Sequence, residues 1–307
     1  MHDPQPYGMK EKLDRIHSPM FAHLIMFAAM RTMVDGVATY PVGDGPSVLY
    51  LPGAGLVGLD FLNLTETPGA AHLPYDRGGT GWSDPVPLPR SAAEVARELS
   101  RVAGPGPHVL VGHSMGAVYA RRFAQLFPAR TAGMLLLDPG HEDLFAHLPA
   151  EAAALNDQMK PDPEQLPELS EEQVAAARTA YAKLYADWPA AVRDELIEHH
   201  LTHWRTGLAE SANLESEVYD ELRHGGPTPD VPTIVLSAGA GNPAWAAFGS
   251  PELIRRALDG ILRLHAGIAT SVTRGEHRVL PGATHQFLHI ERPDEVRGAL
   301  SDLLAAL

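Results

Sequence analysis

Apolar runs and helical patterns alternate along most of the chain. From residue 47 onward, short apolar runs are separated by longer stretches in which apolar residues recur at helical spacing. Such alternation is typical of a parallel sheet that helices cover on both faces. We therefore predict an α/β fold with strands at residues 48–51, 71–75, 108–112, 133–138, 233–237 and 278–280, and weak strands near 37–42.

Helices are predicted at residues 91–103, 115–127 and 293–306. The first begins at Ser91 with Glu94 three positions later, a capping box in which each side chain bonds the other residue's backbone N–H. A further helix is predicted over about 19–34, where Phe21, Leu24 and Ala28 recur at helical spacing. We expect it to pack against the main core, and a soft, Met-rich surface beside a substrate entrance is the alternative.

The pattern breaks between the strands at 133–138 and 233–237. Residues 140–228 are acidic and helical in pattern, and Pro161, Pro163 and Pro167 indicate a loop among them. Because ligands of open α/β sheets bind at the carboxyl ends of the strands, we expect this insertion to form a helical cap there. The predicted catalytic domain then comprises residues 1–139 and 229–307.

Composition and charge narrow the range of partners. The 307 residues are 45% hydrophobic and 20% charged, which is typical of a globular protein. A formal charge of −14 disfavours nucleic acid as a partner, and the absence of cysteine excludes disulfides and thiolate sites. The apolar run at 21–30 is too short to span a membrane, and no leader-peptide pattern accompanies it. We therefore expect a cytoplasmic protein with a small-molecule substrate.

One pentapeptide carries the strongest chemical signal. An apolar run at 109–111 leads into the sequence GHSMG at 112–116, and a helical pattern follows. A G-x-S-x-G sequence between a strand and a helix displays the serine on a sharp turn, where residues larger than glycine would collide. We predict that Ser114 is a nucleophile and that the N–H of Met115, at the start of the helix, stabilises an oxyanion.

A second oxyanion donor is expected in the turn after the strand at 48–51. Gly53 and Gly55 in this turn allow the backbone to approach the serine closely. We assign the donor to the N–H of Ala54, which lies between them. A turn that merely ends the strand is the alternative.

His285 is the predicted general base. It follows the strand at 278–280 and precedes the C-terminal helix, so a loop can bring it to Ser114. In enzymes with this type of elbow, an acid and then a histidine follow the serine along the chain. His285 satisfies that order, whereas His277 and His289 are assigned solvated or structural roles.

The acid is expected at the end of one of two strands. The strand at 233–237 leads to Asn242, which could orient an imidazole but could not stabilise imidazolium by charge. The strand at 133–138 ends in Asp138, which lies between the serine and the histidine in chain order. We therefore assign the acid to Asp138, with Glu142 and Asp143 as alternatives.

Several motifs together resemble one known family. The segment 75–84 reads YDRGGTGWSD, and it accompanies LPGAG at 51–55, GHSMG at 112–116, LLLDP at 135–139 and GATH at 282–285. This set is similar to the α/β-hydrolase-fold enzymes over nearly the whole predicted catalytic domain, although Pro52 stands where histidine is common. The resemblance implies a mostly parallel central sheet flanked by helices and gives Asp76 and Arg77 structural roles. The sequence has no carboxylate near Asn242, where one is common in this family. In this respect it resembles the branch of the family whose catalytic acid follows the strand after the nucleophile helix.

Other polar and aromatic residues of the insertion are assigned to its packing. His199 and His203 have the spacing of metal ligands on a helix, but no third ligand accompanies them. We assign them to a polar face of the cap and predict neither a metal nor a cofactor. The large aromatic residues are expected in the cap core: Tyr181, Tyr185, Trp188 and Trp204.

These assignments predict a serine hydrolase. Ser114 attacks an ester-type carbonyl, His285 transfers the proton, Asp138 holds the imidazole, and an acyl-enzyme forms. A carboxylesterase or lactonase with a compact, largely apolar substrate is the first hypothesis, and thioesterases and C–C bond hydrolases share the triad. A ligand-binding receptor that turns over slowly is the alternative from another functional class.

Overall fold

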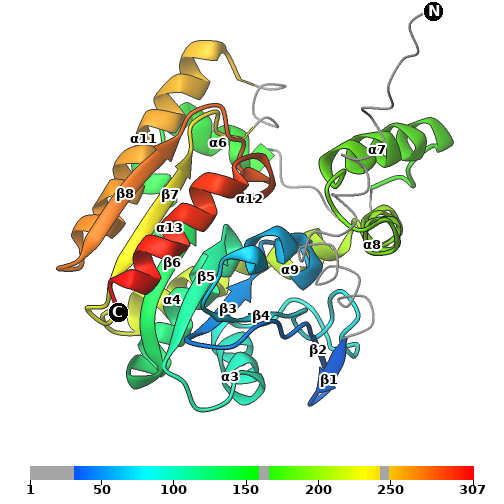
Figure 1. The fold of residues 1–307 in the computed structure, drawn as a ribbon. Helices are drawn as coiled ribbons and strands as arrows, with labels where there is room; N and C mark the ends of the chain where they lie inside the picture. The colour runs from blue at the N-terminus through cyan, green and yellow to red at the C-terminus, as the bar shows by residue number, and fades with distance from the viewer. Residues whose placement is uncertain (1–30, 159–165, 243–248) are drawn as a thin grey trace, which may run out of the picture.

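A six-stranded parallel sheet forms the centre of the computed structural model, which describes residues 31–158, 166–242 and 249–307. The strand order is β4-β3-β5-β6-β7-β8 (Figure 1). The strands are β3 (Ser47–Leu51), β4 (Ala71–Pro74), β5 (His108–His113), β6 (Thr131–Leu137), β7 (Thr233–Ala238) and β8 (Gly275–Leu280). All six strands predicted for this sheet are confirmed, with ends that differ by at most three residues.

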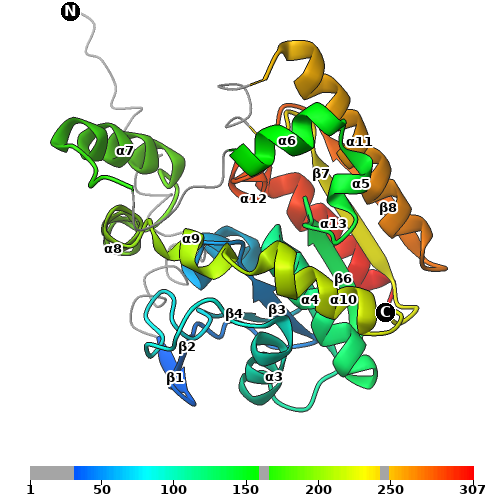
Figure 2. The same ribbon diagram turned by 180° about the vertical axis from the view of Figure 1, so that it is seen from behind.

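Both faces of the sheet are buried under helices. Successive strand residues point to opposite faces, so Leu110 of β5 lies in one core while Val109 and Val111 lie in the other. The first core packs under α3 (Ala92–Val102), α4 (Met115–Leu126) and α11 (Pro251–Thr270). The second packs under the 3-10 helix η1 (Gly58–Glu66) and α13 (Pro293–Ala305), and Figures 1 and 2 view these two faces in turn. Burial on both faces explains why the strands are almost continuously apolar.

The three helices predicted next to these strands are confirmed as α3, α4 and α13. Ser91 caps α3 as expected, because its hydroxyl accepts the N–H of Glu94 at 3.2 Å and its own N–H donates to the Glu94 carboxylate at 2.9 Å. α11 was not predicted, although Ser250 caps it and Pro251 occupies its first turn. Nor was η1, whose apolar residues do not follow α-helical spacing over a long stretch.

The weak strands expected near 37–42 form a separate hairpin. β1 (Thr32–Val34) pairs with β2 (Val37–Thr39) in antiparallel fashion through a turn at Asp35 and Gly36, both of which have positive φ. Residues 19–30 of the predicted N-terminal helix lie outside the described residues. The prediction that this helix reaches residue 34 is wrong, because the turn commits the preceding residues to β1.

Helices make up most of the described part of the insertion between β6 and β7. They are α5 (Leu144–His147), α6 (Ala150–Gln158), α7 (Glu171–Leu184), α8 (Ala190–Thr202), α9 (Thr206–Ser211), the π-helix η3 (Leu214–Val218) and α10 (Tyr219–His224). α7 and α8 lie to one side of the sheet, whereas α5, α6 and α10 lie over the face with α4 and α11 (Figures 1 and 2). No helix in the described residues is long and apolar enough to cross a membrane.

Buried polar contacts attach α7 and α8 to η1. Asp60 of η1 is fully buried, and its Oδ1 lies 2.6 Å from the hydroxyl of Tyr185 and 3.0 Å from Nε2 of His200. The indole N–H of Trp188 donates to the carbonyl of Leu59 at 3.0 Å. Tyr185 and Trp188 are therefore buried against η1 as well as within the insertion.

Candidate active site

Ser114 lies on a strained turn between β5 and α4. Its backbone has φ 51° and ψ −120°, outside the conformations that L-residues favour. The N–H of Ser114 donates to the carbonyl of Leu137 at 3.0 Å, and its own carbonyl accepts the N–H of Gly140 at 3.0 Å. The turn is thus held by the end of β6, and strain held in place by surrounding structure is typical of functional sites.

Close packing explains both glycines of the elbow. A Cβ on Gly112 would lie 2.6 Å from Cα of Ala117, and a Cβ on Gly116 would lie 2.5 Å from the carbonyl oxygen of Pro52. Real Cβ atoms essentially never come within 3.0 Å of such atoms. α4 can therefore turn back this tightly from β5 and rest on the end of β3 only with glycine at both positions.

The structure brings His285 to Ser114. Its Nε2 lies 3.0 Å from Oγ of Ser114, within hydrogen-bond reach. Two backbone hydrogen bonds fix the loop after β8 at His285. The N–H of His285 donates to the carbonyl of Gly241 at 3.0 Å, and the carbonyl of His285 accepts Nε2–H of His113 at 2.7 Å. The side chain of His285 remains partly exposed, as a base that contacts a substrate must be.

Asp138 is the carboxylate that meets His285. Its Oδ2 lies 2.5 Å from Nδ1 of His285, and its Oδ1 accepts the N–H of Ala238 at 2.9 Å. Burial would raise the pKa of Asp138, but the hydrogen bonds that it accepts from His285 and from the N–H of Ala238 lower it below its ordinary value. The carboxylate is therefore ionised at neutral pH and fixes the proton of His285 on Nδ1.

A chain of polar side chains lies behind Asp138. Nε2 of His265 donates to the carbonyl of Pro139 at 3.0 Å, so its Nδ1 is free to accept the hydroxyl of Ser237 at 2.7 Å. Nε2 of His277 lies 2.8 Å from the same hydroxyl. Burial lowers the pKa of His265, which keeps this imidazole neutral beside Asp138.

The two assigned oxyanion donors lie next to Ser114 in the chain or in space. Met115 begins α4, so its N–H has no carbonyl in a preceding helical turn. Ala54 follows β3, which pairs with β5, and a Cβ built on the adjacent Gly53 would lie 3.3 Å from Cβ of Ser114. Among the described residues, the N–H of Ala54 makes no hydrogen bond.

A cavity of about 190 Å³ opens beside Ser114 and His285. α5, η3, α10 and α11 supply most of its wall, together with the loops after β6 and β7. The side chains of that wall are mainly apolar, with two amides and one phenol among them: Leu144, Asn156, Leu214, Tyr219, Asn242, Leu258 and Ile261. No lysine or arginine belongs to the described lining of this cavity, and its basic groups are the imidazoles of His265 and His285.

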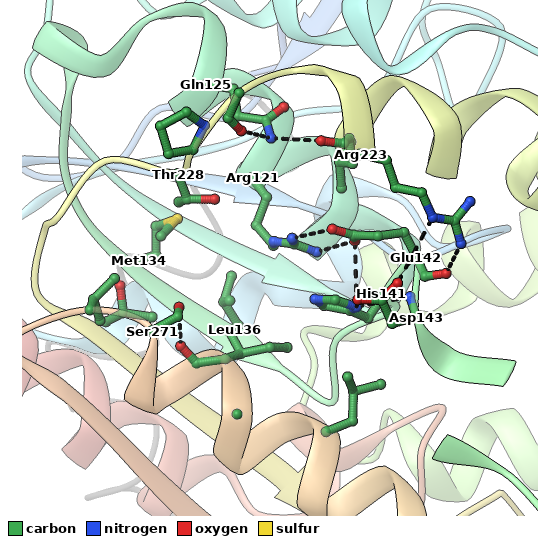
Figure 3. Close-up of a pocket in the computed structure, with 18 of the residues that line it drawn as sticks. Arg121, Gln125, Met134, Leu136, His141, Glu142, Asp143, Arg223, Thr228 and Ser271 are labelled. Atoms are coloured by element: carbon green, nitrogen blue, oxygen red, sulfur yellow. Dashed lines mark hydrogen bonds and ion pairs between the residues drawn. The ribbon is translucent and has the colours of Figure 1, made fainter. Parts of the chain in front are cut away.

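A larger cavity, of about 630 Å³, lies between α4, α10 and α11. Figure 3 shows Arg121 paired with Glu142 in its lining, with His141 and Asp143 beside them. The two guanidinium Nη atoms lie 2.6 and 2.7 Å from the two carboxylate oxygens, and both side chains are buried. Neither Ser114 nor His285 lines this cavity, so its size does not make it the candidate active site.

The residues considered as alternatives lie elsewhere. Glu142 is paired with Arg121, and the side chain of Asp143 is 56% exposed. His289 is fully buried and stacks on Phe61 with ring centroids 4.4 Å apart, so it is not solvated. Burial lowers the pKa of His289 to about 4.

The histidine pair of α8 also has a packing role. The rings of His199 and His203 stack with centroids 4.6 Å apart, and His199 contacts Trp82. Among the described residues, no three His, Asp or Glu side chains are grouped as metal ligands.

The part of the wall that α11 supplies was not predicted from the sequence, whereas a cap formed by the insertion was expected. Leu258, Ile261 and His265 recur at helical spacing on the side of α11 that faces the cavity. That periodicity could have revealed the helix, but not that its side chains reach Ser114. The structural roles expected for Asp76 and Arg77 agree with their contacts, since both are buried and bonded to loop backbone.

A sequence profile of the alpha/beta hydrolase family matches residues 48–299. Shorter stretches match two curated proteins. One of 101 residues is 34% identical to the polyketide synthase ThaQ of Burkholderia thailandensis, and one of 77 residues is 35% identical to the lipase LipV of Mycobacterium tuberculosis. These stretches are 31% and 25% of the chain, but only 5% of ThaQ and 29% of LipV. The chain thus spans less than a third of the length of either relative.

Solved structures share the fold over most of the chain. An esterase from Thermogutta terrifontis superposes with a TM-score of 0.60 at 20% identity, over 90% of this chain and 96% of the esterase. Epoxide hydrolase I from potato (Solanum tuberosum) superposes with a TM-score of 0.61 at 16% identity, over 91% of this chain and 99% of that enzyme. Identities this low establish the fold alone. Together with the profile match, they confirm the fold class expected from the sequence.

Proposed function

Because the chain belongs to the alpha/beta hydrolase family, we propose that it is a serine hydrolase that cleaves ester bonds through Ser114, His285 and Asp138. The observation that carries this proposal is the continuous contact from Oγ of Ser114 to His285 at 3.0 Å and from His285 to Asp138 at 2.5 Å. A base within hydrogen-bond reach of a hydroxyl, itself oriented by a third group, is the arrangement that activates a serine.

Each group has one chemical task. Nε2 of His285 accepts the proton of Ser114 as Oγ attacks the carbonyl carbon, and Asp138 stabilises the imidazolium that forms. The N–H groups of Met115 and Ala54 donate to the oxyanion of the tetrahedral intermediate. His285 then protonates the departing alkoxide, which leaves an acyl-enzyme. Water, deprotonated by the same imidazole, releases the acid and restores Ser114.

The cavity supports a compact, largely apolar substrate such as a short-chain ester or lactone. Its volume of about 190 Å³ and its apolar wall suit an uncharged acyl group. Likeness in fold to an epoxide hydrolase does not transfer that activity. Epoxide opening needs a carboxylate nucleophile, whereas the elbow of this chain presents Ser114.

In this proposal, residues 140–228 act as a cap over the site. The support is that α5, η3 and α10 of this segment all contribute to the cavity beside Ser114. Such a cap excludes water from the carbonyl and so strengthens the electrostatic contacts made to the oxyanion.

Hydrolysis of p-nitrophenyl butyrate by the wild-type protein and by Ser114→Ala tests the proposal. We expect wild-type turnover, labelling of Ser114 by a fluorophosphonate, and a kcat about 10⁶-fold lower in the variant. A wild-type protein that neither turns over esters, lactones or thioesters nor reacts with the fluorophosphonate would refute the serine hydrolase function. Preference for a thioester within that panel would instead redirect the substrate class.

A further inference from the structure

Glu210 joins the insertion to the core beside Ser114. It belongs to α9 and forms an ion pair with Arg77, which follows β4; Nη2 of Arg77 lies 2.7 Å and Nε lies 2.8 Å from Oε1 of Glu210. The side chains are only 2% and 3% exposed. A pair this deeply buried is held in one geometry, because either partner alone would be an uncompensated charge.

Arg77 also holds the peptide that carries the proposed oxyanion donor. Its Nη1 donates to the carbonyl of Pro52 at 2.5 Å, and its Nη2 donates to the carbonyl of Gly53 at 2.9 Å. The carbonyl of Gly53 and the N–H of Ala54 belong to the same planar trans peptide, in which they point in opposite directions. Fixing the carbonyl on Arg77 therefore points the N–H of Ala54 away from Arg77.

Glu210 holds the next peptide of the same loop. Its Oε2 accepts the N–H of Gly55 at 2.9 Å. Gly207, one turn earlier on α9, lies so close that a Cβ there would be 3.0 Å from both N and Cα of Gly55. The backbone of α9 is thus seated directly on the loop, beside η1 in Figure 2, and Gly207 and Glu210 share the helix face that contacts it.

We propose that Glu210 is a positioning residue that orients the N–H of Ala54, so that the oxyanion hole is complete only while α9 is docked on Arg77. This inference rests on the proposed hydrolase function. Without the carboxylate, Arg77 is a buried cation without its ionic partner and the N–H of Gly55 loses its acceptor. The carbonyl of Gly53 keeps its contacts to Arg77 and to the N–H of Leu56 at 3.2 Å, but the peptide after Ala54 is no longer fixed, so the turn that carries the N–H of Ala54 is held less firmly. Because an oxyanion donor acts chiefly in the transition state, the loss falls on kcat rather than on KM.

The matched control is Glu221 of α10. It also reaches from the insertion to the core, where its carboxylate accepts the N–H groups of Ala92 and Ala93 at 2.9 and 2.8 Å. It contacts the start of α3 and not the loop that contains Ala54. Glu221→Gln therefore reproduces the loss of a bridging carboxylate without disturbing the oxyanion donors.

Kinetics of Glu210→Ala, Glu210→Gln and Glu221→Gln on p-nitrophenyl butyrate test the proposal. We expect Glu210→Ala to lower kcat about 100-fold with KM nearly unchanged. Glu210→Gln should recover part of that loss, since its amide oxygen can still accept the N–H of Gly55, and Glu221→Gln should keep the wild-type kcat. Wild-type kcat in Glu210→Ala, or an equal fall of kcat in Glu221→Gln, would overturn the proposal.

Amide hydrogen exchange in a Ser114→Ala background gives a readout that needs no turnover. We expect the N–H of Gly55 to exchange faster after Glu210→Ala and to stay protected after Glu221→Gln. Unchanged protection of Gly55 would overturn the positioning role while leaving the hydrolase proposal intact. A wild-type protein without turnover or fluorophosphonate labelling would instead remove the proposed function, and this role with it.

Discussion

Two cavities of this molecule are lined by charged side chains, and these side chains have different bonding partners in the two cavities. In the larger cavity, Arg121 and Glu142 bond each other through two parallel contacts at 2.6 and 2.7 Å (Figure 3). In the smaller one, Asp138 bonds His285, and His285 bonds a hydroxyl rather than a second charge. In the first arrangement the two charges bond each other, whereas the second ends at the hydroxyl of Ser114.

This difference teaches that unused hydrogen-bonding capacity marks a reactive site better than volume does. The larger cavity has about three times the volume, yet its most buried charges already satisfy each other. Around Ser114, the N–H groups of Met115 and Ala54 have no acceptor among the described residues. Those groups are available to an oxyanion, which is where catalytic stabilisation is usually greatest.

The largest effect on kcat is expected from a change of Asp138, the carboxylate in the smaller cavity. Asp138→Asn should lower kcat about 10⁴-fold, because an amide cannot hold His285 in the required tautomer or stabilise imidazolium. Asn242→Ala, in the loop after β7 where an orienting residue was also considered, should have a mild effect. Steady-state kinetics of both variants decide the matter, and the reverse ranking would contradict the assignment of Asp138.

A smaller effect is expected from breaking the ion pair of the larger cavity. Glu142→Leu should reduce the free energy of unfolding by about 3–5 kcal/mol, since Arg121 would remain buried without its partner. The double variant Arg121→Leu/Glu142→Leu should be more stable than Glu142→Leu, because no charge is left unpaired. Urea denaturation measures the two differences. A double variant as unstable as the single one would contradict the view that the instability of Glu142→Leu comes from the unpaired charge of Arg121.

The same variants should keep a kcat close to that of the wild-type protein, since neither Arg121 nor Glu142 lines the cavity beside Ser114. A loss of kcat comparable to that of Asp138→Asn, in a protein that remains folded, would break the comparison. It would mean that the larger cavity controls the loop after Asp138.

The smallest effect concerns the buried histidine behind the Ser114 site. Burial lowers the pKa of His289 to about 4, so the folded protein resists protonation there while the unfolded chain binds a proton below about pH 6.5. Lowering the pH from 6.5 to 4 therefore reduces the free energy of unfolding. The reduction that His289 causes is complete by about pH 4, where the folded protein binds the proton as well. His289→Phe should make the free energy of unfolding less dependent on pH by about 3 kcal/mol over that window. Denaturation at several pH values tests it, and parallel curves for the two proteins would contradict the role of His289.

Local signals account for the parts of the fold that were predicted well. The apolar strands, the capping box at Ser91 and the G-x-S-x-G elbow each depend on neighbours within a few residues, so they can be recognised in the sequence. Residues 32–34 were wrongly predicted as helix because the helical spacing upstream of them does not show where the two-residue turn at Asp35 and Gly36 begins a hairpin. α11 has regular helical spacing, but it was not predicted.

The sequence by itself determined the parallel α/β architecture, the serine on its elbow and the order in which an acid and a histidine must follow it. The sequence assigned the acid to Asp138 but left Glu142 and Asp143 as alternatives, because the three lie within six residues of one another. The tertiary structure separates them, since Asp138 at the end of β6 contacts His285 whereas Glu142 contacts Arg121. Only the tertiary structure, too, paired Arg77 with Glu210, which are 133 positions apart in the chain. Contacts of that range depend on how the helices of the insertion pack against the sheet, and no local pattern of residues encodes that packing.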